Sequence, residues 1–148
     1  EAQSANGTRT NCPDMGIGST VLYTVPLNTF SSTVSQADAN QQAYIAAQAN
    51  APTYANIHGT CTWYNMAQSG VFTRLNCPAG QTGGSVTYTV PAQTYSSNLS
   101  LAHANQLALN DVAANGQAYA NASGACIPTC NPACNFPAQK CIDGVCKK

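Results

Sequence analysis

The sequence predicts an α+β fold of two small tandem strand–helix–strand modules, each stapled by a disulfide, followed by a cysteine-rich tail with a hairpin. Three observations predict it. The chain has an internal repeat of 65 positions, its hydrophobic period changes within each repeat, and eight cysteines occur in 148 residues. We expect repeat module 1 at residues 1–61, a bridging strand and the start of module 2 at 62–76, module 2 at 77–126 and the tail at 127–148.

The repeat is the strongest signal in the sequence. Shifted by 65 positions, residues 2–61 align with residues 67–126 without a gap, and by direct count 30 of the 60 pairs are identical. The matches include Asn-Cys-Pro at 11–13 and 76–78, and Tyr-Thr-Val-Pro at 23–26 and 88–91. Identity at half of the positions predicts one shared fold, so we call the two segments repeat one and repeat two.

Each repeat first predicts a strand that ends at Pro26 or Pro91. Apolar residues with strand propensity alternate before each proline, namely Val21, Tyr23 and Val25 in repeat one and Val86, Tyr88 and Val90 in repeat two. A serine-rich turn follows. It ends at Ser35 or Ser100, where an N-cap is expected, and Val34 or Leu99 stands in position for a hydrophobic staple with Ala39 or Ala104.

An alanine-rich helix is predicted next. In repeat two it is expected from about Leu101 to Asn115, with Gly116 as its stop signal. Its buried face is expected to contain Ala104, Ala108, Leu109 and Val112. In repeat one the helix is expected to stop at Ala51-Pro52, because proline lacks the helical N–H.

The remaining segments predict a bridging strand and a tail hairpin. Residues 62–76 contain the apolar residues of the bridge: Trp63, Tyr64, Val71 and Phe72. In the tail, Asp143-Gly144 is a typical two-residue turn between Cys141 and Cys146.

The cysteines predict disulfides more strongly than zinc, because the spacing C-x3-C-x6-C-x4-C in the tail lacks the paired C-x2-C of zinc ribbons. Repeat symmetry suggests Cys12–Cys61 and Cys77–Cys126, and the tail would pair Cys130–Cys141 and Cys134–Cys146, one of three connectivities. A second pattern also respects the repeat: Cys61–Cys77, with Cys126 bonded to Cys12 of another chain. We expect no metal and no cofactor.

Composition excludes several classes of protein. Charged residues are only 7% of the chain, with five bases and five acids, so the basic stripe of a nucleic-acid binder is missing. No apolar run reaches 18 residues, so we expect no membrane span. The high, even cysteine count and a start at Glu1 suggest a mature secreted protein, extracellular or at a cell surface.

Few residues suggest catalysis, and we expect no enzyme. His103 and Asp111 are eight positions apart on one predicted helix, but a solvated helix surface explains them better than an acid–base pair. Asp38 suits the first helical turn, where a carboxylate favours the helix dipole. Candidate aromatic contacts are Trp63, Tyr64 and Phe72, and candidate glycosylation sites are Asn6, Asn98 and Asn121.

A family resemblance rests on Asn-Cys-Pro, Tyr-Thr-Val-Pro, Ser-Ser, the Ala-Asn-Gln helix and Tyr-Ala-Asn…Gly-x-Cys. These motifs, over residues 2–126, resemble a tandem-repeat domain of uncharacterised function from secreted and surface proteins of Bacteroidetes-type bacteria. The tail resembles small cysteine-rich modules of secreted proteins. The resemblance implies an extracellular setting and tandem use, and it implies no activity.

The leading functional hypothesis is an extracellular structural subunit that self-assembles head-to-tail into a filament or surface appendage. The end of repeat one can contact the start of repeat two only once inside the chain. The start of repeat one and the end of repeat two carry the same matched residues without a partner, and if they met between chains, such heterologous contacts would form rings or filaments. Strand donation by residues 1–11 is one form, with candidate inter-subunit contacts at Ala2, Gln3, Ser4, Thr8 and Arg9. The alternatives are a monomeric surface adhesin or glycan-binding module, and a small cysteine-rich inhibitor acting through its tail.

Overall fold

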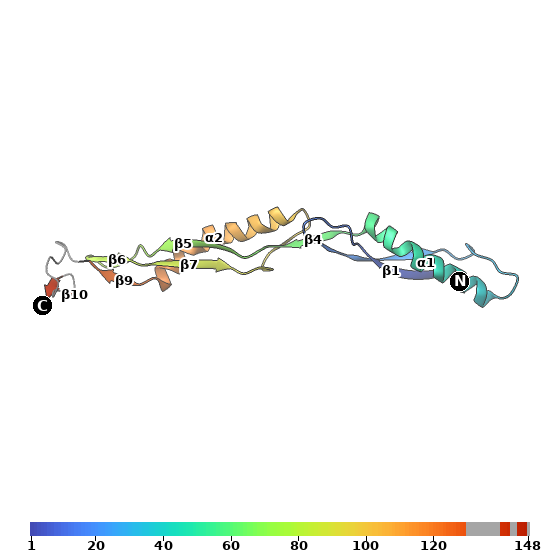
Figure 1. Ribbon diagram of the computed structural model, residues 1–148, viewed down its shortest axis with the longest axis horizontal. Helices are drawn as coiled ribbons and strands as arrows, with labels where there is room; N and C mark the ends of the chain where they lie inside the picture. Colours follow the sequence, from blue (N-terminus) through green and yellow to red (C-terminus); the bar gives the residue numbers. More distant parts are fainter. Residues whose placement is uncertain (130–139, 143–144, 148) are drawn as a thin grey trace. The chain divides into compact units, whose positions relative to one another are not determined.

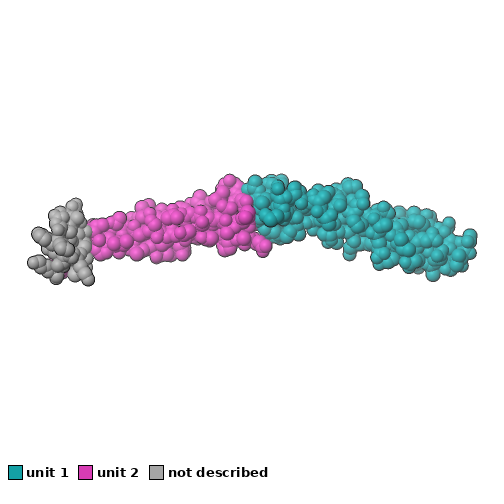
Figure 2. Space-filling view, in the orientation of Figure 1, with its two compact units in different colours: residues 1–64, 96–104 teal, residues 65–95, 105–148 magenta. Residues whose placement is uncertain are grey.

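The computed structural model describes residues 1–129, 140–142 and 145–147. It divides the chain into two compact units, shown in Figure 2. Unit 1 comprises Glu1–Tyr64 and Ser96–Ala104, and unit 2 comprises Asn65–Tyr95 and Asn105–Lys148. The units therefore differ from the sequence repeats, because unit 1 contains a short segment of repeat two.

Unit 1 contains two small antiparallel sheets and one long helix. Strand β1 (Gln3–Thr8) pairs with β3 (Thr20–Val25) along its whole length, from Gln3↔Val25 to Thr8↔Thr20. The second sheet has the order β2–β4–β8, formed by Ile17–Gly18, Cys61–Tyr64 and Ser96–Ser97. Helix α1 (Gln36–His58) lies along the β1–β3 hairpin (Figure 1).

Unit 2 repeats this plan. Strand β5 (Gln68–Thr73) pairs with β7 (Ser85–Val90), and the register is that of repeat one shifted by 65 positions. Strand β6 (Gln81–Gly83) pairs with β9 (Cys126–Pro128). Helix α2 (Leu101–Ser123) begins within the residues of unit 1, and the rest of it belongs to unit 2. The mixed α+β fold and the two tandem modules are therefore as the sequence predicts.

The tail contains the predicted hairpin strands. Strands β10 (Lys140–Ile142) and β11 (Val145–Lys147) are antiparallel, with Cys141 opposite Cys146. The predicted turn at Asp143 and Gly144 lies outside the described residues.

Both helices bury a stripe of small residues at a strict spacing of four. The stripe allows the helix backbone to lie close to the hairpin, and the strand residues Val25 and Val90 complete the core. The buried helical positions are Ala39, Ala43, Ala47, Ala51 and Ala55 in α1, and Ala104, Ala108, Val112, Gly116 and Ala120 in α2. Leu109, expected on this face, is 41% exposed, so that expectation is wrong.

The helices begin where the sequence predicts. The Oγ of Ser35 accepts a hydrogen bond from the N–H of Asp38 at 3.0 Å, and the Oγ of Ser100 accepts one from His103 at 3.0 Å. The predicted hydrophobic staples do not form, because Val34 is 82% exposed and Leu99 is 74% exposed. Capping by serine alone therefore fixes both starts.

The predicted helix ends are wrong in both repeats. Helix α1 continues through Pro52 to His58, and α2 continues through Gly116 to Ser123. The residue after each helix is a glycine that bonds back to it: the N–H of Gly59 bonds to Ala55 O and the N–H of Gly124 bonds to Ala120 O, each at 2.8 Å. Helical proline costs about 3 kcal/mol and helical glycine about 1 kcal/mol. Burial of the last stripe residues against the hairpin offsets these costs.

One contact between strand and helix uses side chains of different size in the two repeats. In repeat one, Gly7 lies against the helix backbone, and a Cβ on Gly7 would be 2.1 Å from the carbonyl oxygen of Ala51. In repeat two the equivalent pair is Phe72 and Gly116, and a Cβ on Gly116 would be 2.0 Å from the Phe72 ring. Gly116 is therefore a packing residue that makes room for an aromatic ring.

Candidate strand-acceptor site

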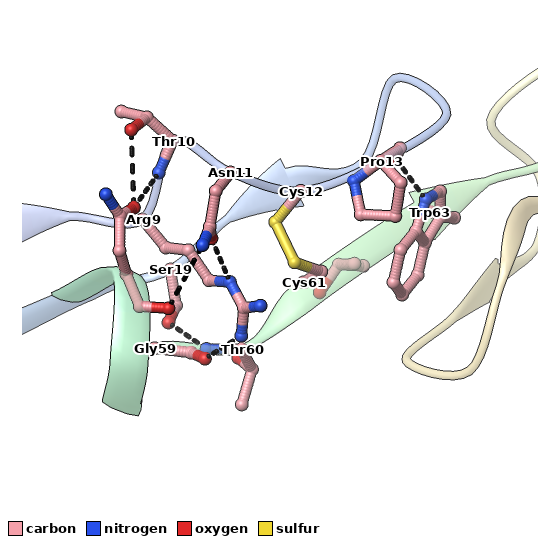
Figure 3. Close-up of a disulfide and its surroundings, with 12 residues drawn as sticks. Arg9, Thr10, Asn11, Cys12, Pro13, Ser19, Gly59, Thr60, Cys61 and Trp63 are labelled. Carbon is pink, nitrogen blue, oxygen red and sulfur yellow. Dashed lines mark hydrogen bonds between the residues drawn. A yellow bond between two sulfur atoms is a disulfide. The ribbon is translucent and has the colours of Figure 1, made fainter.

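The disulfides follow the repeat. Cys12 bonds to Cys61 and Cys77 bonds to Cys126, each over a sequence separation of 49 (Figure 3 shows the first). The repeat-symmetric pairing is confirmed, and the alternative bond Cys61–Cys77 is wrong. The tail pairings predicted for Cys130 and Cys134 lie outside the described residues.

Arg9 is part of the fold beside this disulfide. Its Nη1 donates to the carbonyl of Gly59 at 2.7 Å, and its Nε donates to Asn11 Oδ1 at 2.8 Å (Figure 3). Arg74 makes the same two bonds, to Gly124 and Asn76. A cation beside the last carbonyls of a helix is favourable. The structure therefore uses Arg9 inside unit 1, although the sequence suggested it as an inter-subunit contact.

The other candidate contact residues lie at the β1–β3 hairpin. Ala2 precedes β1, and Gln3, Ser4 and Thr8 lie in it. Ser4 and Thr8 exchange hydroxyl hydrogen bonds with Thr24 and Thr20, at 2.8 and 2.9 Å. Donation of residues 1–11 to another subunit would break this pairing with β3. We therefore replace strand donation by residues 1–11 with another form of contact.

The candidate aromatic residues serve mainly as core. Trp63 is 8% exposed, and its Nε1 donates to the carbonyl of Pro13 at 2.9 Å (Figure 3). Phe72 packs with the cluster formed by Val90, Ala108 and Val112. Tyr64 is 42% exposed. The structure therefore does not bring these three residues together as an exposed platform.

The three candidate glycosylation sites differ in environment. Asn6 is exposed on β1, and exposed Asn98 accepts a hydrogen bond from Thr62 at 3.0 Å. Asn121 is half-buried, and its Oδ1 accepts bonds from the Leu75 N–H at 2.9 Å and from Gln117 at 3.0 Å. The Asn121 side chain is therefore used in hydrogen bonds within the fold, which makes it the least suitable of the three for glycosylation.

His103 and Asp111 have separate local partners. His103 Nδ1 lies 2.9 Å from the Oγ of Ser97. Asp111 accepts hydrogen bonds from the hydroxyls of Tyr95 at 2.7 Å and Tyr88 at 3.1 Å, and from Asn115 at 2.7 Å. Asp111 is therefore an anchor for two tyrosines, which neither the acid–base reading nor the solvated-surface reading predicted.

This network shifts three pKa values. The hydrogen bond from Tyr95, followed by that from Asn115, lowers the pKa of Asp111. The bond to Asp111 raises the pKa of Tyr95, whereas desolvation is the first cause of the raised pKa of Tyr88. Repeat one has Phe30 and Ala46 at the positions of Tyr95 and Asp111, so the network belongs to repeat two alone.

We expect the network to make unit 2 sensitive to pH. The pKa of Asp111 is lowered by folding, so its stabilising effect is complete above about pH 4 and is lost as the pH falls through its folded pKa. The tyrosine pKa values are raised, so their effect is lost as the pH rises above about 10. In denaturant unfolding across pH, Tyr95→Phe should flatten both slopes relative to the wild type. Phe30→Tyr is the matched control, because it places a tyrosine at the equivalent position of repeat one, where Ala46 stands in place of Asp111. Equal slopes for Tyr95→Phe and the wild type would contradict the assignment.

The end of repeat one is a shared strand. Strand β4 pairs with β2 through Ile17↔Thr62 and Gly18↔Cys61, and with β8 through Trp63↔Ser97 and Tyr64↔Ser96. Strand β2 belongs to repeat one and β8 to repeat two. The last strand of one repeat is therefore completed by the serine-rich turn of the next.

Asn65, the residue after β4, forms hydrogen bonds with the loop of residues 91–95 in unit 2. It is 2% exposed. Its Nδ2 donates to the carbonyls of Pro91 and Met66, each at 2.8 Å, and its Oδ1 accepts from the Tyr95 N–H at 2.6 Å. Its backbone N–H bonds to Tyr95 O at 3.0 Å, and its carbonyl accepts from the Gln93 N–H at 2.9 Å. Asn65 therefore bonds to four backbone groups of this loop: the carbonyl of Pro91, the N–H of Gln93, and the N–H and carbonyl of Tyr95.

The equivalent loop in unit 1 has the same conformation. Asn28 has a φ of 63° and its equivalent Gln93 has a φ of 64°. The hydroxyls of Thr29 and Thr94 bond to the carbonyls of Pro26 and Pro91, at 2.7 and 2.8 Å. Within the described part of the chain, however, no hydrogen bond involves the backbone of Asn28 or Phe30. The loop of unit 1 thus presents the same backbone groups, but among the described residues none of them has the bonds that Asn65 makes in unit 2.

A pocket of about 290 Å³ opens at this loop. It lies between the start of the chain, the loop with its serine turn, and the first turns of α1. Its lining includes Pro26, Asn28, Phe30, Ser32, Ala39 and Asn40. The amino group of Glu1 donates to Asn40 Oδ1 at 2.8 Å, as the N–H of Met66 donates to Asn105 at 2.8 Å. The pocket therefore corresponds, by repeat position, to the place of Asn65 in unit 2, and we call it the acceptor pocket.

The chemistry of the acceptor pocket suits a peptide strand. It offers backbone N–H groups, a carbonyl and the alanine floor of a helix, and the described residues contain no group of three His, Cys, Asp or Glu that could hold a metal ion. None of the residues predicted as contacts or aromatic sites lines it. A sequence signal existed in Thr-Val-Pro-x-x-Thr-Phe/Tyr-Ser-Ser, which is common to both repeats, but it does not show that one loop is filled and the other open.

The fold and the pocket define a disulfide-stapled tandem-repeat protein whose successive repeats share a strand. A family model matches residues 1–62 and 63–127, so the chain belongs to the family described as "Family of unknown function (DUF5977)". The tandem-repeat domain of uncharacterised function expected from the resemblance is thereby confirmed. Comparison with curated proteins and with solved structures found no significant match. Among the described residues, no helix is long and apolar enough to cross a bilayer.

Proposed function

We propose that this protein is an extracellular structural subunit whose repeats join head-to-tail, the acceptor pocket of unit 1 receiving the end of a preceding repeat. The role is architectural and non-enzymatic. Two disulfides support an oxidising compartment outside the cytosol.

The observation that carries the proposal is the double pairing of β4. One strand satisfies β2 of its own repeat and β8 of the next, so a following repeat completes the sheet of the preceding one. The serine turn equivalent to β8 in repeat one is Ser31-Ser32, and it lines the acceptor pocket. A repeat placed before it would find the same partner groups. Contacts between different surfaces of this kind propagate along a line.

The end of repeat two differs from the end of repeat one. Pro128 stands where repeat one has Trp63, and proline has no N–H for a ladder. Thr129 bonds through its N–H and its hydroxyl to the carbonyl of Gly80, at 2.8 and 2.9 Å, and so follows its own repeat. The homopolymer expected from the sequence is therefore refined: the proposed partner is a subunit that ends as repeat one ends.

The test is a variant whose second repeat ends with the sequence that ends repeat one. In the variant, residues 62–65 (Thr-Trp-Tyr-Asn) follow Cys126 directly and replace residues 127–148. We expect this variant to form head-to-tail polymers that grow with concentration, measured by sedimentation velocity and negative-stain electron microscopy without reductant. The control is a chain that stops at Thr129, which should stay small.

A second control blocks the acceptor. Ala39→Leu in the same variant places a larger side chain in the pocket and should return the protein to single subunits. A variant that keeps both disulfides and remains monomeric at every concentration would contradict the proposal. The adhesin reading and a glycan-binding screen would then take its place.

A further inference from the structure

We infer that the acceptor pocket is a binding site selective for asparagine at the end of an incoming strand with the pattern aromatic–aromatic–asparagine, as in Trp63-Tyr64-Asn65. The inference deepens the proposed function and rests on it for the source of the strand, which is the end of a preceding repeat. Three observations carry the argument: the position of the pocket, the backbone of Asn28 and Phe30, which has no partner among the described residues, and the chemistry of the amide.

The first step is the equivalence of the two loops. Asn28 and Phe30 correspond to Gln93 and Tyr95, and their side chains differ. The contacts of Asn65 with Gln93 and Tyr95 use only the backbone of those residues, so the side-chain differences leave them unchanged. The helix floor is conserved between the repeats, because Ala39 and Ala43 correspond to Ala104 and Ala108.

The second step is the chemistry of the side chain. Asn65 uses both amide functions at once: the Nδ2 donates to two carbonyls and the Oδ1 accepts from an N–H. Aspartate would present a carboxylate to the Pro91 carbonyl and would lose both donated bonds. Alanine would leave the Tyr95 N–H without this acceptor and would remove one of the two hydrogen bonds to the Pro91 carbonyl, which keeps only its bond from Thr94. In unit 1 the same groups are Pro26 O and the Phe30 N–H.

The third step is the backbone. The N–H of Asn65 bonds to Tyr95 O and its C=O accepts from the Gln93 N–H, so the incoming residue binds the loop through its backbone as well as its side chain, directly after a strand. The two aromatic residues before it pair with the serine turn, Trp63 with Ser97 and Tyr64 with Ser96. In repeat one Ser31 and Ser32 hold these positions. Strand pairing supplies affinity, and the asparagine supplies the selection.

The experiment uses the full oxidised chain and a fluorescein-labelled peptide of residues 60–65, with serine in place of Cys61 (Thr-Ser-Thr-Trp-Tyr-Asn). Anisotropy titration should show saturable binding, and in ¹⁵N spectra the amides of Asn28 and Phe30 should shift. The peptide ending in alanine or aspartate should bind about tenfold more weakly or worse. A peptide of residues 125–130 with its cysteines changed to serine should bind no better than these.

Protein variants test the location. Ala39→Leu should abolish binding, whereas Gln41→Leu, an exposed position on the same helix, should leave it unchanged. To cover weak binding in trans, Thr-Trp-Tyr-Asn is also joined directly before Glu1, which raises its effective concentration. Hydrogen exchange at Asn28 and Phe30 should then slow at least tenfold, and the same extension ending in alanine should show no slowing.

Equal exchange with asparagine and alanine extensions, or equal affinity of the peptides, would overturn the inference. Its failure is distinguishable from failure of the proposed function. Polymers that still form when the added end reads Thr-Trp-Tyr-Ala would uphold head-to-tail assembly and overturn selection by asparagine. Peptide binding at the pocket without polymer formation would uphold the site and overturn the assembly.

Discussion

Cys12→Ser/Cys61→Ser is expected to lower the free energy of unfolding by about 4 kcal/mol, because the bond closes a loop with a sequence separation of 49 in the unfolded chain. Units of this size bury a modest fraction of their surface, so the loss is a large part of total stability. Urea denaturation monitored by circular dichroism measures it.

The second repeat provides the matched control. Cys77→Ser/Cys126→Ser removes a bond with the same separation of 49, so a loss of similar size is expected. The two bonds lie in different units, and the double removal should give nearly additive losses. A loss well below 1 kcal/mol for either removal would contradict a role of the disulfides in stability.

Gly116→Ala is expected to destabilise unit 2 by about 3 kcal/mol, because overpacking at a fixed contact forces backbone or ring to move. The added Cβ would be 2.0 Å from the Phe72 ring. Phe72→Gly should relieve this strain, since glycine on the strand and alanine on the helix is the combination of Gly7 and Ala51 in repeat one. Thermal or denaturant unfolding of both single variants and the double variant measures the coupling.

The expected sign of the coupling is specific. Phe72→Gly alone is destabilising because it removes a ring from the core of unit 2. The double variant should be more stable than the sum of the two single losses predicts, by about 1 kcal/mol or more. Additive losses for Phe72→Gly and Gly116→Ala would contradict the packing account.

Gly80→Ala is a comparison variant without a packing clash. Gly80 has open space around it but a φ of +81°, so the stability lost in Gly80→Ala reports backbone strain alone.

The sequence predicted the parts of the fold that local chemistry and repeat symmetry determine. Strand alternation before Pro26 and Pro91, serine caps at Ser35 and Ser100, and the paired cysteines are all short-range or repeat-wide signals, and the structure confirms them. These features depend on few distant contacts.

The helix ends could not be predicted because tertiary packing overrides the local signals there. Pro52 and Gly116 are unfavourable in a helix taken alone. Each follows or occupies a buried stripe position, and the alanines beyond them, Ala55 and Ala120, are fully buried. Packing of the helix against the strands therefore determines where the helix ends.

The acceptor pocket could not be predicted either, since it depends on which loop is filled. The motifs around Pro26 and Pro91 are nearly the same in both repeats. Only the structure shows that Asn65 bonds to one loop while the backbone of Asn28 and Phe30 has no partner in the described residues. The Asp111 network is equally hidden, because Tyr88 and Tyr95 precede Asp111 by 23 and 16 positions, beyond the range of local sequence patterns.

The positions of the two cysteine bonds have a mechanical consequence. Each bond joins the segment just after the first strand of a repeat to the residue where its last strand begins. Tension applied along the backbone between the two ends of a repeat passes through sulfur, and the hairpin strand and long helix between the cysteines carry none of it. Under tension the two helices are therefore protected from unfolding by force, and the two repeats can extend only through residues outside the two disulfide loops.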